Sequence, residues 1–201
     1  DNDLPMEKRP AFVSWWDYGH WAIHMGEHPA VADNFQYGLH VAGNIITAQN
    51  ETKTIALFAV RIMDKTWRED KVKEVCVKHL GEDDTKKLYD VFKNPKKYID
   101  IILDNPDIYG PRSSDLNEIN AKYVAASHII ASRDMEEVVD FYADLINVTG
   151  YSIRYFGVDS RLFPFSARNT GIFYAPCKLS DHRISKKMNV PIDFLEIKAI
   201  D

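Results

Sequence analysis

The chain has 201 residues, a formal net charge of −5 and 45% hydrophobic residues, which predicts one domain that buries a core of its own. The acidic balance argues against nucleic acid as the main partner, because phosphate binding usually shows as a basic patch. No stretch approaches the ~20 apolar residues of a membrane span, and residues 1–5 have no basic or apolar leader. We therefore expect a single soluble domain over residues 1–201.

The first third of the chain is predicted to hold one short strand and several helices. The apolar and aromatic run that begins at Ala11 is typical of a strand. Trp21 and Met25 have helical spacing, and Pro29 ends that helix. We expect a strand at 11–16, a turn at 17–19, an extended piece at 30–34, and helices at 20–28, 38–48 and 52–63.

The middle of the chain is predicted to be helical. Gly81 is expected to close one helix, and the pair Asn94-Pro95 separates the next two, because proline disfavours helix in the preceding residue. Pro106, Gly110 and Pro111 mark the clearest loop. We expect helices at 68–80, 84–93 and 95–104 and a loop at 105–114.

The last third of the chain is predicted to contain strands around one helix. Ser132 is a good N-cap with acids in the first turn after it, and Gly150 is the expected C-cap. A strand–helix–strand unit at 122–158 implies a parallel pair with a right-handed crossover. We expect strands at 122–130, 152–158, 172–175 and 194–200 and a helix at 132–148. The expected fold class is mixed α/β: a helix-rich domain with a small mixed sheet flanked by helices.

Two sets of residues could bear metal or redox chemistry. Cys76 and Cys177 lack zinc-type spacing, and they are either two buried thiols or one disulfide. His20, His24 and His28 recur every four residues, which would place them on one helical face and leaves a zinc-dependent hydrolase as an alternative. The HExxH order of zinc proteases is absent, so this is a weak motif.

The run Trp-Trp-Asp-Tyr-Gly at residues 15–19, here called the aromatic segment, is the most distinctive feature of the sequence. Adjacent tryptophans on a strand point to opposite faces, so one is expected in the core and the other exposed. An exposed indole beside Asp17 offers an apolar wall, an N–H donor and a carboxylate acceptor. This set suits a small hydroxyl group. The alternative interpretation is a purely structural role, as a core aromatic cluster with a capping Asp.

The aromatic segment resembles the signature of the oligosaccharyltransferase catalytic subunit. Residues 20–23 and 32–38 also resemble that family, and residues 156–164 and 171–176 resemble its archaeal AglB branch in the short form. The resemblance implies that the chain is the soluble C-terminal domain of a membrane enzyme, on the extracytoplasmic side of the cell membrane. The N-terminal multi-spanning region of such an enzyme is absent from this chain.

The resemblance also implies a function. Members of the family transfer a glycan from a dolichol phosphate or pyrophosphate donor to Asn in Asn-X-Ser/Thr. On this sequence, Trp15, Trp16 and Asp17, with Tyr18 and Gly19, would bind the Ser or Thr two residues after the acceptor Asn. The family's Mn or Mg ion and catalytic carboxylates lie in the membrane region, so we expect no catalytic or metal-binding residue here and no activity of this fragment alone.

A second family motif lies on a helix and completes the hydroxyl site. By resemblance it falls at Asp134, Met135 and Val138, where Met135 and Val138 would share a helix face and contact the methyl of a sequon Thr. The sequence lacks the Lys of one version and has Val where the other has Ile. Rival matches are Asp70 with Lys73 and Asp84 with Lys87, in charged segments typical of solvated faces. For Met135 and Val138, the alternative interpretation is that they are ordinary core residues.

Two further possibilities stay open. The exposed aromatics could serve a free-standing peptide- or carbohydrate-binding module without an attached transferase. The chain itself contains two sequons, Asn50-Glu51-Thr52 and Asn147-Val148-Thr149, which are candidate glycosylation acceptors.

Overall fold

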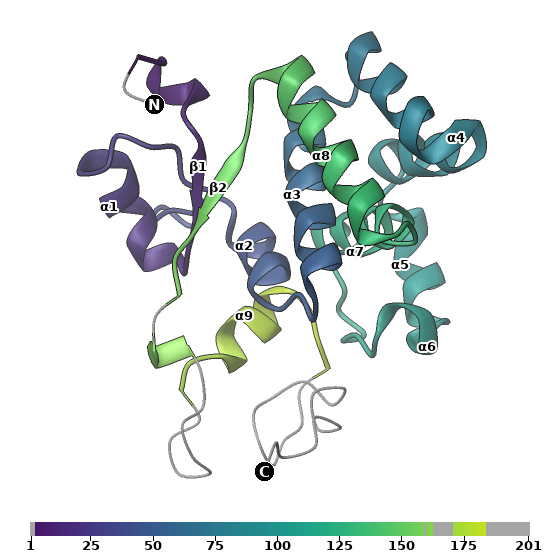
Figure 1. The fold of residues 1–201 in the computed structure, drawn as a ribbon. Coiled ribbons are helices and arrows are strands. Elements are labelled where there is room, and N and C mark those ends of the chain that lie inside the picture. The colour runs from purple at the N-terminus through teal and green to yellow at the C-terminus, as the bar shows by residue number, and fades with distance from the viewer. Residues whose placement is uncertain (1–2, 159, 163–170, 184–201) are drawn as a thin grey trace, which may run out of the picture.

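A computed structural model describes residues 3–158, 160–162 and 171–183. Figure 1 shows two short strands and α1 on one side and a group of long helices on the other. The α-helices are α1 (Gly19–His24), α2 (Leu39–Ile46), α3 (Glu51–Thr66), α4 (Asp70–Lys93), α5 (Lys97–Leu103), α6 (Pro106–Tyr109), α7 (Glu118–Ile130), α8 (Met135–Thr149) and α9 (Tyr174–Leu179). Short 3-10 helices lie at Met6–Lys8, Trp16–Tyr18 and Ser160–Leu162.

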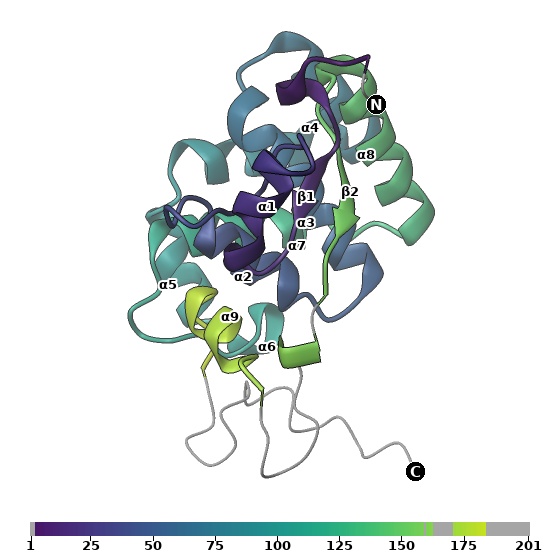
Figure 2. The ribbon, with the colours of Figure 1, turned by 90° about the vertical axis from the view of Figure 1, so that its left-hand side faces the viewer.

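The sheet consists of two parallel strands, β1 (Ala11–Val13) and β2 (Ile153–Phe156). The register pairs Ala11 with Ile153 and Phe12 with Tyr155, so one extra residue of β2 bulges between them. On its other side, Phe12 forms a single bridge with Ala30. Seen from the sheet side, α1 and the strands lie in front of α3 and α7 (Figure 2). The mixed, helix-rich fold class is confirmed.

Two of the strands expected from sequence are wrong. Residues 122–130 belong to α7, whose first turn is capped by the Asn117 side-chain oxygen accepting from the Asn120 N–H at 2.9 Å. A buried apolar run has no polar face, so periodicity alone does not separate strand from helix. Residues 172 and 173 form a turn, and residues 174 and 175 begin α9. The parallel partner of β2 is therefore β1, and the segment 194–200 lies outside the described residues.

The helix ends explain the remaining boundaries. Asp134, not Ser132, caps α8: its carboxylate accepts from the Glu137 N–H at 2.9 Å, and Glu137 accepts from the Asp134 N–H at 3.3 Å. Gly150 ends α8 with a φ of 69°, as expected for a glycine C-cap. Gly81 has a φ of 76° and open space where a Cβ would lie, and it interrupts α4 where the sequence predicts a helix end.

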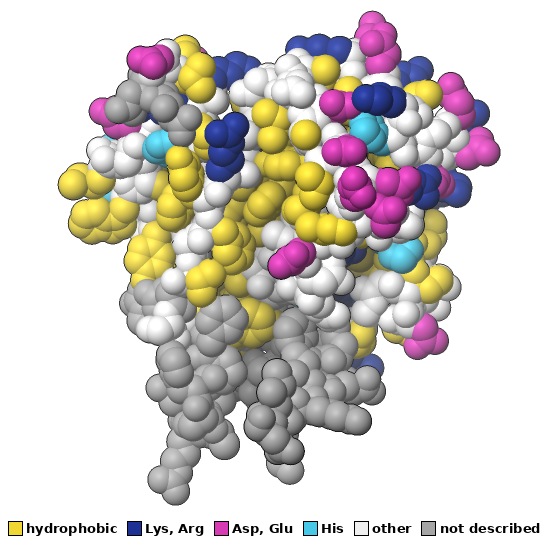
Figure 3. Space-filling model, in the orientation of Figure 1, with side chains coloured by type: hydrophobic (Ala, Val, Ile, Leu, Met, Phe, Trp, Pro, Cys, Tyr) yellow, Lys and Arg dark blue, Asp and Glu magenta, His cyan; other side chains and the backbone are white. Residues whose placement is uncertain are grey.

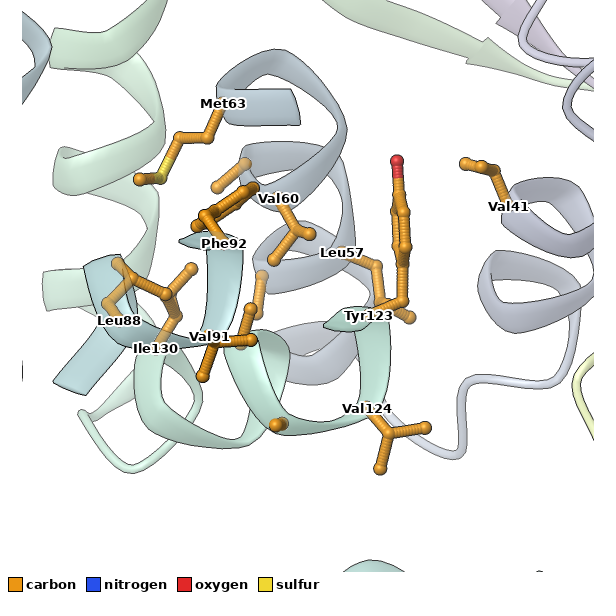
Figure 4. Packing of buried hydrophobic residues seen from close by; sticks show 14 of the residues in the cluster. Val41, Leu57, Val60, Met63, Leu88, Val91, Phe92, Tyr123, Val124 and Ile130 are labelled. Atoms are coloured by element: carbon orange, nitrogen blue, oxygen red, sulfur yellow. The ribbon is translucent and has the colours of Figure 1, made fainter. Parts of the chain in front are cut away.

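The main core lies among the long helices. Figure 4 shows side chains of α3, α4 and α7 meeting, among them Leu57, Val91 and Tyr123. Phe141 and Leu145 of α8 add to the same cluster. A second, smaller cluster forms around Trp15 with side chains of α2 and α9. Cys76 belongs to the main cluster and Cys177 to the smaller one; both thiols are buried, and no disulfide joins them.

Candidate functional site

The aromatic segment lies directly after β1, at the junction with α1. The strand ends at Val13, and Trp16–Tyr18 form a 3-10 turn in which the Tyr18 N–H donates to the Trp15 carbonyl at 3.0 Å. The expectation that both tryptophans lie on a strand is therefore wrong. Trp15 is 7% exposed and Trp16 is half-buried, with their ring centroids 6.3 Å apart.

The smaller cluster anchors the aromatic segment. Trp15 packs with Ala42 and Ile46 of α2 and with Phe173 and Cys177 at α9, and Trp16 and Tyr18 lie against the same cluster. Helix α9 can approach α2 closely because Gly43 has no side chain: a Cβ there would lie 2.9 Å from the Leu179 Cβ. The position of Trp16 therefore depends on a helix from the far end of the sequence.

Gly19 is required for space rather than for turning. Its φ of −59° is an ordinary helical value. A Cβ at this position would lie 1.9 Å from the Ala32 carbonyl oxygen, which no side chain tolerates. Gly19 therefore lets the start of α1 pack against residues 32–33, and this contact fixes the direction in which α1 leaves the aromatic segment.

The polar groups of Trp16 and Asp17 are the chemically important feature of the segment. Both residues are half-buried and consecutive on one 3-10 turn. Within the described residues, neither the indole N–H of Trp16 nor the carboxylate of Asp17 has a hydrogen-bond or ion-pair partner. One donor and one acceptor are thus left available on consecutive residues, which is the pair that a hydroxyl group requires.

An apolar groove of about 560 Å³ lies beside the segment and is lined by Phe12, Tyr18, Trp21 and Tyr155, among others. Figure 3 shows apolar side chains gathered over α1 and the strands. Trp21 and Met25, which have helical spacing in the sequence, are 63% and 75% exposed. Four further large apolar side chains are also exposed: Phe35, Tyr37, Phe156 and Val158. Exposed apolar groups in such numbers are typical of an interaction surface.

The second-motif residues lie in different surroundings. Asp134 is the exposed cap of α8, Val138 is 1% exposed in the main core, and the Met135 sulfur accepts from the Thr52 hydroxyl at 3.3 Å. In the part of the chain that the structure describes, no hydrogen bond or shared packing cluster joins Met135 to Trp16. The structure does not bring the two sets of predicted residues together through direct contacts.

The rival matches to the second motif are surface residues. Asp70 and Lys73 are exposed on α4. Asp84 is paired with Lys87 at 2.9 Å and with Arg133 at 2.8 Å, and hydrogen bonds from Lys87 and then Arg133 lower the pKa of its carboxyl. These contacts connect α4 with the start of α8, which is a structural role.

The histidine series does not share one helical face. Helix α1 ends at His24, so only His20 and His24 stack, with ring centroids 4.1 Å apart. His28 lies beyond the helix, and its Nδ1 is 2.8 Å from the Pro10 carbonyl oxygen. The described residues contain no group of three or more His, Cys, Asp or Glu side chains placed to hold a metal ion.

The two sequons lie at helix ends. The side-chain oxygen of Asn50 accepts from the Lys53 N–H at 2.8 Å and caps α3. Asn147 is exposed in the last turn of α8. Both asparagines lie at the surface, and whether either carries a glycan stays a prediction.

Comparison with known proteins points to one enzyme class over part of the chain. Residues 4–72 match the family model of the AglB core domain. Dolichyl-phosphooligosaccharide-protein glycotransferase 2 of Archaeoglobus fulgidus is 38% identical over 55 residues, which are 27% of this chain and 8% of that protein. Glycotransferase 1 of the same organism is 37% identical over 58 residues, 28% of this chain and 10% of its own length.

The chain spans a small part of the length of the relatives that it matches. The matches span at most a tenth of the length of either relative. No solved structure matches the chain, and no helix in the described residues has the length and apolar character to cross a bilayer. The family model nevertheless covers β1, the aromatic segment, α1, α2 and α3. Over residues 4–72, the chain therefore resembles the core domain of archaeal oligosaccharyltransferases.

Proposed function

We propose that this chain is the acceptor-recognition domain of an oligosaccharyltransferase. The whole enzyme would transfer a glycan from a dolichol phosphate or pyrophosphate donor to Asn in Asn-X-Ser/Thr, on the extracytoplasmic side of the membrane. Its Mn or Mg ion would be bound outside this chain. The observation that carries the proposal is the half-buried Trp16 and Asp17, with a donor and an acceptor available on one turn, inside the segment that resembles the AglB core.

The proposed chemistry is recognition of a hydroxyl group. The Asp17 carboxylate accepts a hydrogen bond from the hydroxyl group, and the Trp16 indole N–H donates a hydrogen bond to the hydroxyl oxygen. The buried Trp15 keeps the turn against α2 and α9. An acceptor peptide without a hydroxyl two residues after Asn would leave both protein groups unpaired in a half-buried place, which costs free energy. This cost gives a physical reason for selecting Ser or Thr.

Met135 is the proposed second contact, for the methyl group of a sequon Thr. Its half-buried position at the start of α8 and its flexible thioether support this role. Met135→Ala in the full-length enzyme should lower transfer to Thr peptides more than transfer to Ser peptides. Equal loss for both peptides would assign Met135 to the structure of α8 and not to the acceptor site.

The main test is transfer to Asn-X-Thr peptides by the full-length enzyme with Asp17→Ala or Trp16→Phe. Asp17→Ala should reduce kcat/KM by about a hundredfold, since it removes a hydrogen bond to a charged group and leaves its partner unpaired. Trp16→Phe keeps an aromatic ring and removes the N–H, so a smaller loss is expected. Asp140→Ala, an exposed acid of α8, is the matched control, and unchanged transfer by Asp17→Ala would refute the assignment.

A free-standing carbohydrate- or peptide-binding module is the second candidate. The apolar groove beside the aromatic segment favours it, because exposed aromatic faces such as Trp21 suit sugar rings and apolar side chains. Titration of the 201-residue chain with oligosaccharides and with Asn-X-Thr peptides separates the two functions. Oligosaccharide binding that is lost in Trp21→Ala and kept in Asp17→Ala would favour the module.

A further inference from the structure

A second cavity, here called the basic pocket, lies where the ends of four helices meet and has a volume of about 780 Å³. The C-terminal ends of α2 and α7 and the N-terminal ends of α3 and α8 line it, together with the segment that contains α6. Two N-termini and two C-termini face the same space, so the helix dipoles largely cancel. Side chains therefore decide the charge of the basic pocket.

The less exposed charges of the basic pocket are positive. Lys53 and Arg112 are half-buried, whereas the acids in the lining, Asp107 and Asp134, are exposed. Arg133 also lines the pocket, but its guanidinium is paired with Asp84. Within the described part of the chain, the Lys53 ammonium has no hydrogen-bond or ion-pair partner. A partly buried cation without a counter-charge is costly, and a bound anion would supply the missing partner.

Arg112 is held firmly at the pocket wall. Its Nη1 donates to the Ser180 carbonyl at 3.1 Å and lies 2.9 Å from His182 Nδ1, and its Nη2 donates to the Tyr109 carbonyl at 3.2 Å. An arginine stays protonated at all physiological pH values. The pocket therefore has one fixed positive charge, and Lys53 supplies a second charge that titrates.

The pKa values of the neighbouring groups reflect this accumulation of positive charge. Burial and then the charge of Arg112 lower the pKa of Lys53 to about 7. Burial and then Lys53 lower the pKa of His128, and burial followed by Arg112 and Lys53 lowers that of His182 well below its ordinary value. Nearby cations disfavour each other's charged forms. A bound anion would reverse these effects.

We propose that the basic pocket binds a small molecule that bears a phosphate group, held by the Lys53 ammonium in the field of Arg112. Two positive charges match a dianionic group better than a carboxylate. A cavity of this size suits a small organic ligand rather than a lone ion. The pocket is separate from the aromatic segment, although Asp134 and Met135 line it, and the proposal does not depend on the proposed function.

The first test is a titration of the 201-residue chain with inorganic pyrophosphate and with glucose 1-phosphate. Lys53→Met should weaken binding about tenfold or more, as expected for a lost hydrogen bond to a charged group. Lys65→Met, an exposed lysine on the same helix, should leave binding unchanged. Circular dichroism of both variants checks that the fold is retained.

Two further readouts separate recognition of charge from a structural role for Lys53. Sulfate does not titrate near neutral pH, so its binding should tighten as the pH falls from about 8 to about 6 and Lys53, with His128, becomes charged. Nitrogen-15 NMR of labelled lysine should show the pKa of Lys53 rising when pyrophosphate is added. An unchanged Lys53 pKa at saturating pyrophosphate would overturn the proposal.

The phosphate could belong to a soluble molecule or to a lipid headgroup. Co-sedimentation with phosphatidylcholine vesicles, with and without phosphatidic acid, tests the lipid source. Binding to either the soluble or the vesicle probe that requires Lys53 supports the proposal and assigns the source. Binding to neither probe, or binding that Lys53→Met leaves intact, would overturn it.

Discussion

Two regions of the molecule use their apolar side chains differently. The helical body, residues 51–149, buries them in the main cluster beneath an exposed surface where Asp, Glu, Lys and Arg alternate. The motif layer, which comprises β1, residues 15–46, β2 and α9, contributes a few side chains to the main cluster, forms the smaller cluster around Trp15, and exposes Trp21, Phe35 and Tyr37. Figure 3 shows charged groups over α4 and α8 and apolar groups over α1 and the strands. The body supplies stability, and the layer leaves apolar surface available for binding.

The motif layer also depends on contacts between distant parts of the sequence. Its two strands are separated by more than the whole helical body, and Trp15 packs against α9. The short strands and α1 would not be stable alone, because isolated short elements gain too little from their own hydrogen bonds. The comparison therefore predicts that changes in the body alter global stability, whereas changes in the layer alter local geometry and binding.

The largest effect on stability should come from the core of the body. Phe141→Ala removes a side chain that is 1% exposed and should lower the free energy of unfolding by about 3–5 kcal/mol. Val139→Ala, on the outer face of the same helix, should change it by less than about 0.5 kcal/mol. Chemical denaturation measures both. A small loss for Phe141→Ala would contradict the view that the body carries the stability.

A smaller but more local effect is expected at Gly19. Gly19→Ala creates a clash with the Ala32 backbone and should cost about 1–3 kcal/mol, with loss of acceptor binding in the full-length enzyme. Gly81→Ala places a side chain where the space is open but φ is 76° and ψ is 170°, and this strained backbone should cost about 1–3 kcal/mol without affecting binding. Similar binding losses in the two variants would show that Gly19 acts only through overall stability.

Thiol labelling compares the local stability of the two regions. Burial raises the pKa of the Cys76 thiol to about 12, and Cys177 is buried in the smaller cluster. Both should react only after opening, and Cys177 should react faster by on the order of tenfold, which corresponds to about 1.4 kcal/mol of local stability. Mass spectrometry after timed alkylation measures this ratio. Faster labelling of Cys76 than of Cys177 would contradict the expectation that the motif layer is locally less stable than the body.

The smallest effect is expected at a surface carboxylate of the body. Hydrogen bonds from Lys97 and then Asn94 lower the pKa of Asp90 to about 2. Its contribution to stability is therefore present above about pH 4, where the unfolded group is ionised, and is lost as the pH falls through about 2. Asp90→Asn should cost at most about 1 kcal/mol at neutral pH and flatten the acid side of the stability curve. A curve of stability against pH that runs parallel in the variant and the wild type would show that Asp90 contributes nothing to the pH dependence of stability.

The helices of the body are largely predictable from the sequence because they carry local signals. Periodicity predicts the segments that become α2 and α3, and Gly81 and Gly150 mark helix ends. Helix α7 has the sequence pattern of a strand because neighbours on nearly every side bury it, so no polar face reveals its period. The pairing of β1 with β2 depends on contacts across the whole chain, and no local pattern encodes it.

The candidate sites show the same division. The aromatic segment is contiguous and distinctive, so the sequence alone points to it, but no local pattern reveals that α1 leaves Trp21 63% exposed. The basic pocket could not be predicted, because Lys53, Arg112, His128 and His182 come from four separate segments. Each of these residues alone is indistinguishable from an ordinary surface or core residue. Only their convergence in the fold makes the pocket visible.

The most direct test of hydroxyl recognition compares kcat/KM for Asn-X-Thr and Asn-X-Val peptides in the full-length enzyme, with and without Asp17→Asn. Thr and Val have nearly the same shape and differ in the hydroxyl, so the wild-type enzyme should prefer Thr by a factor on the order of 10⁴. Asp17→Asn should reduce this preference by about a hundredfold, because the charged acceptor is lost. An unchanged Thr-to-Val ratio in the variant would contradict the claim that Asp17 reads the hydroxyl.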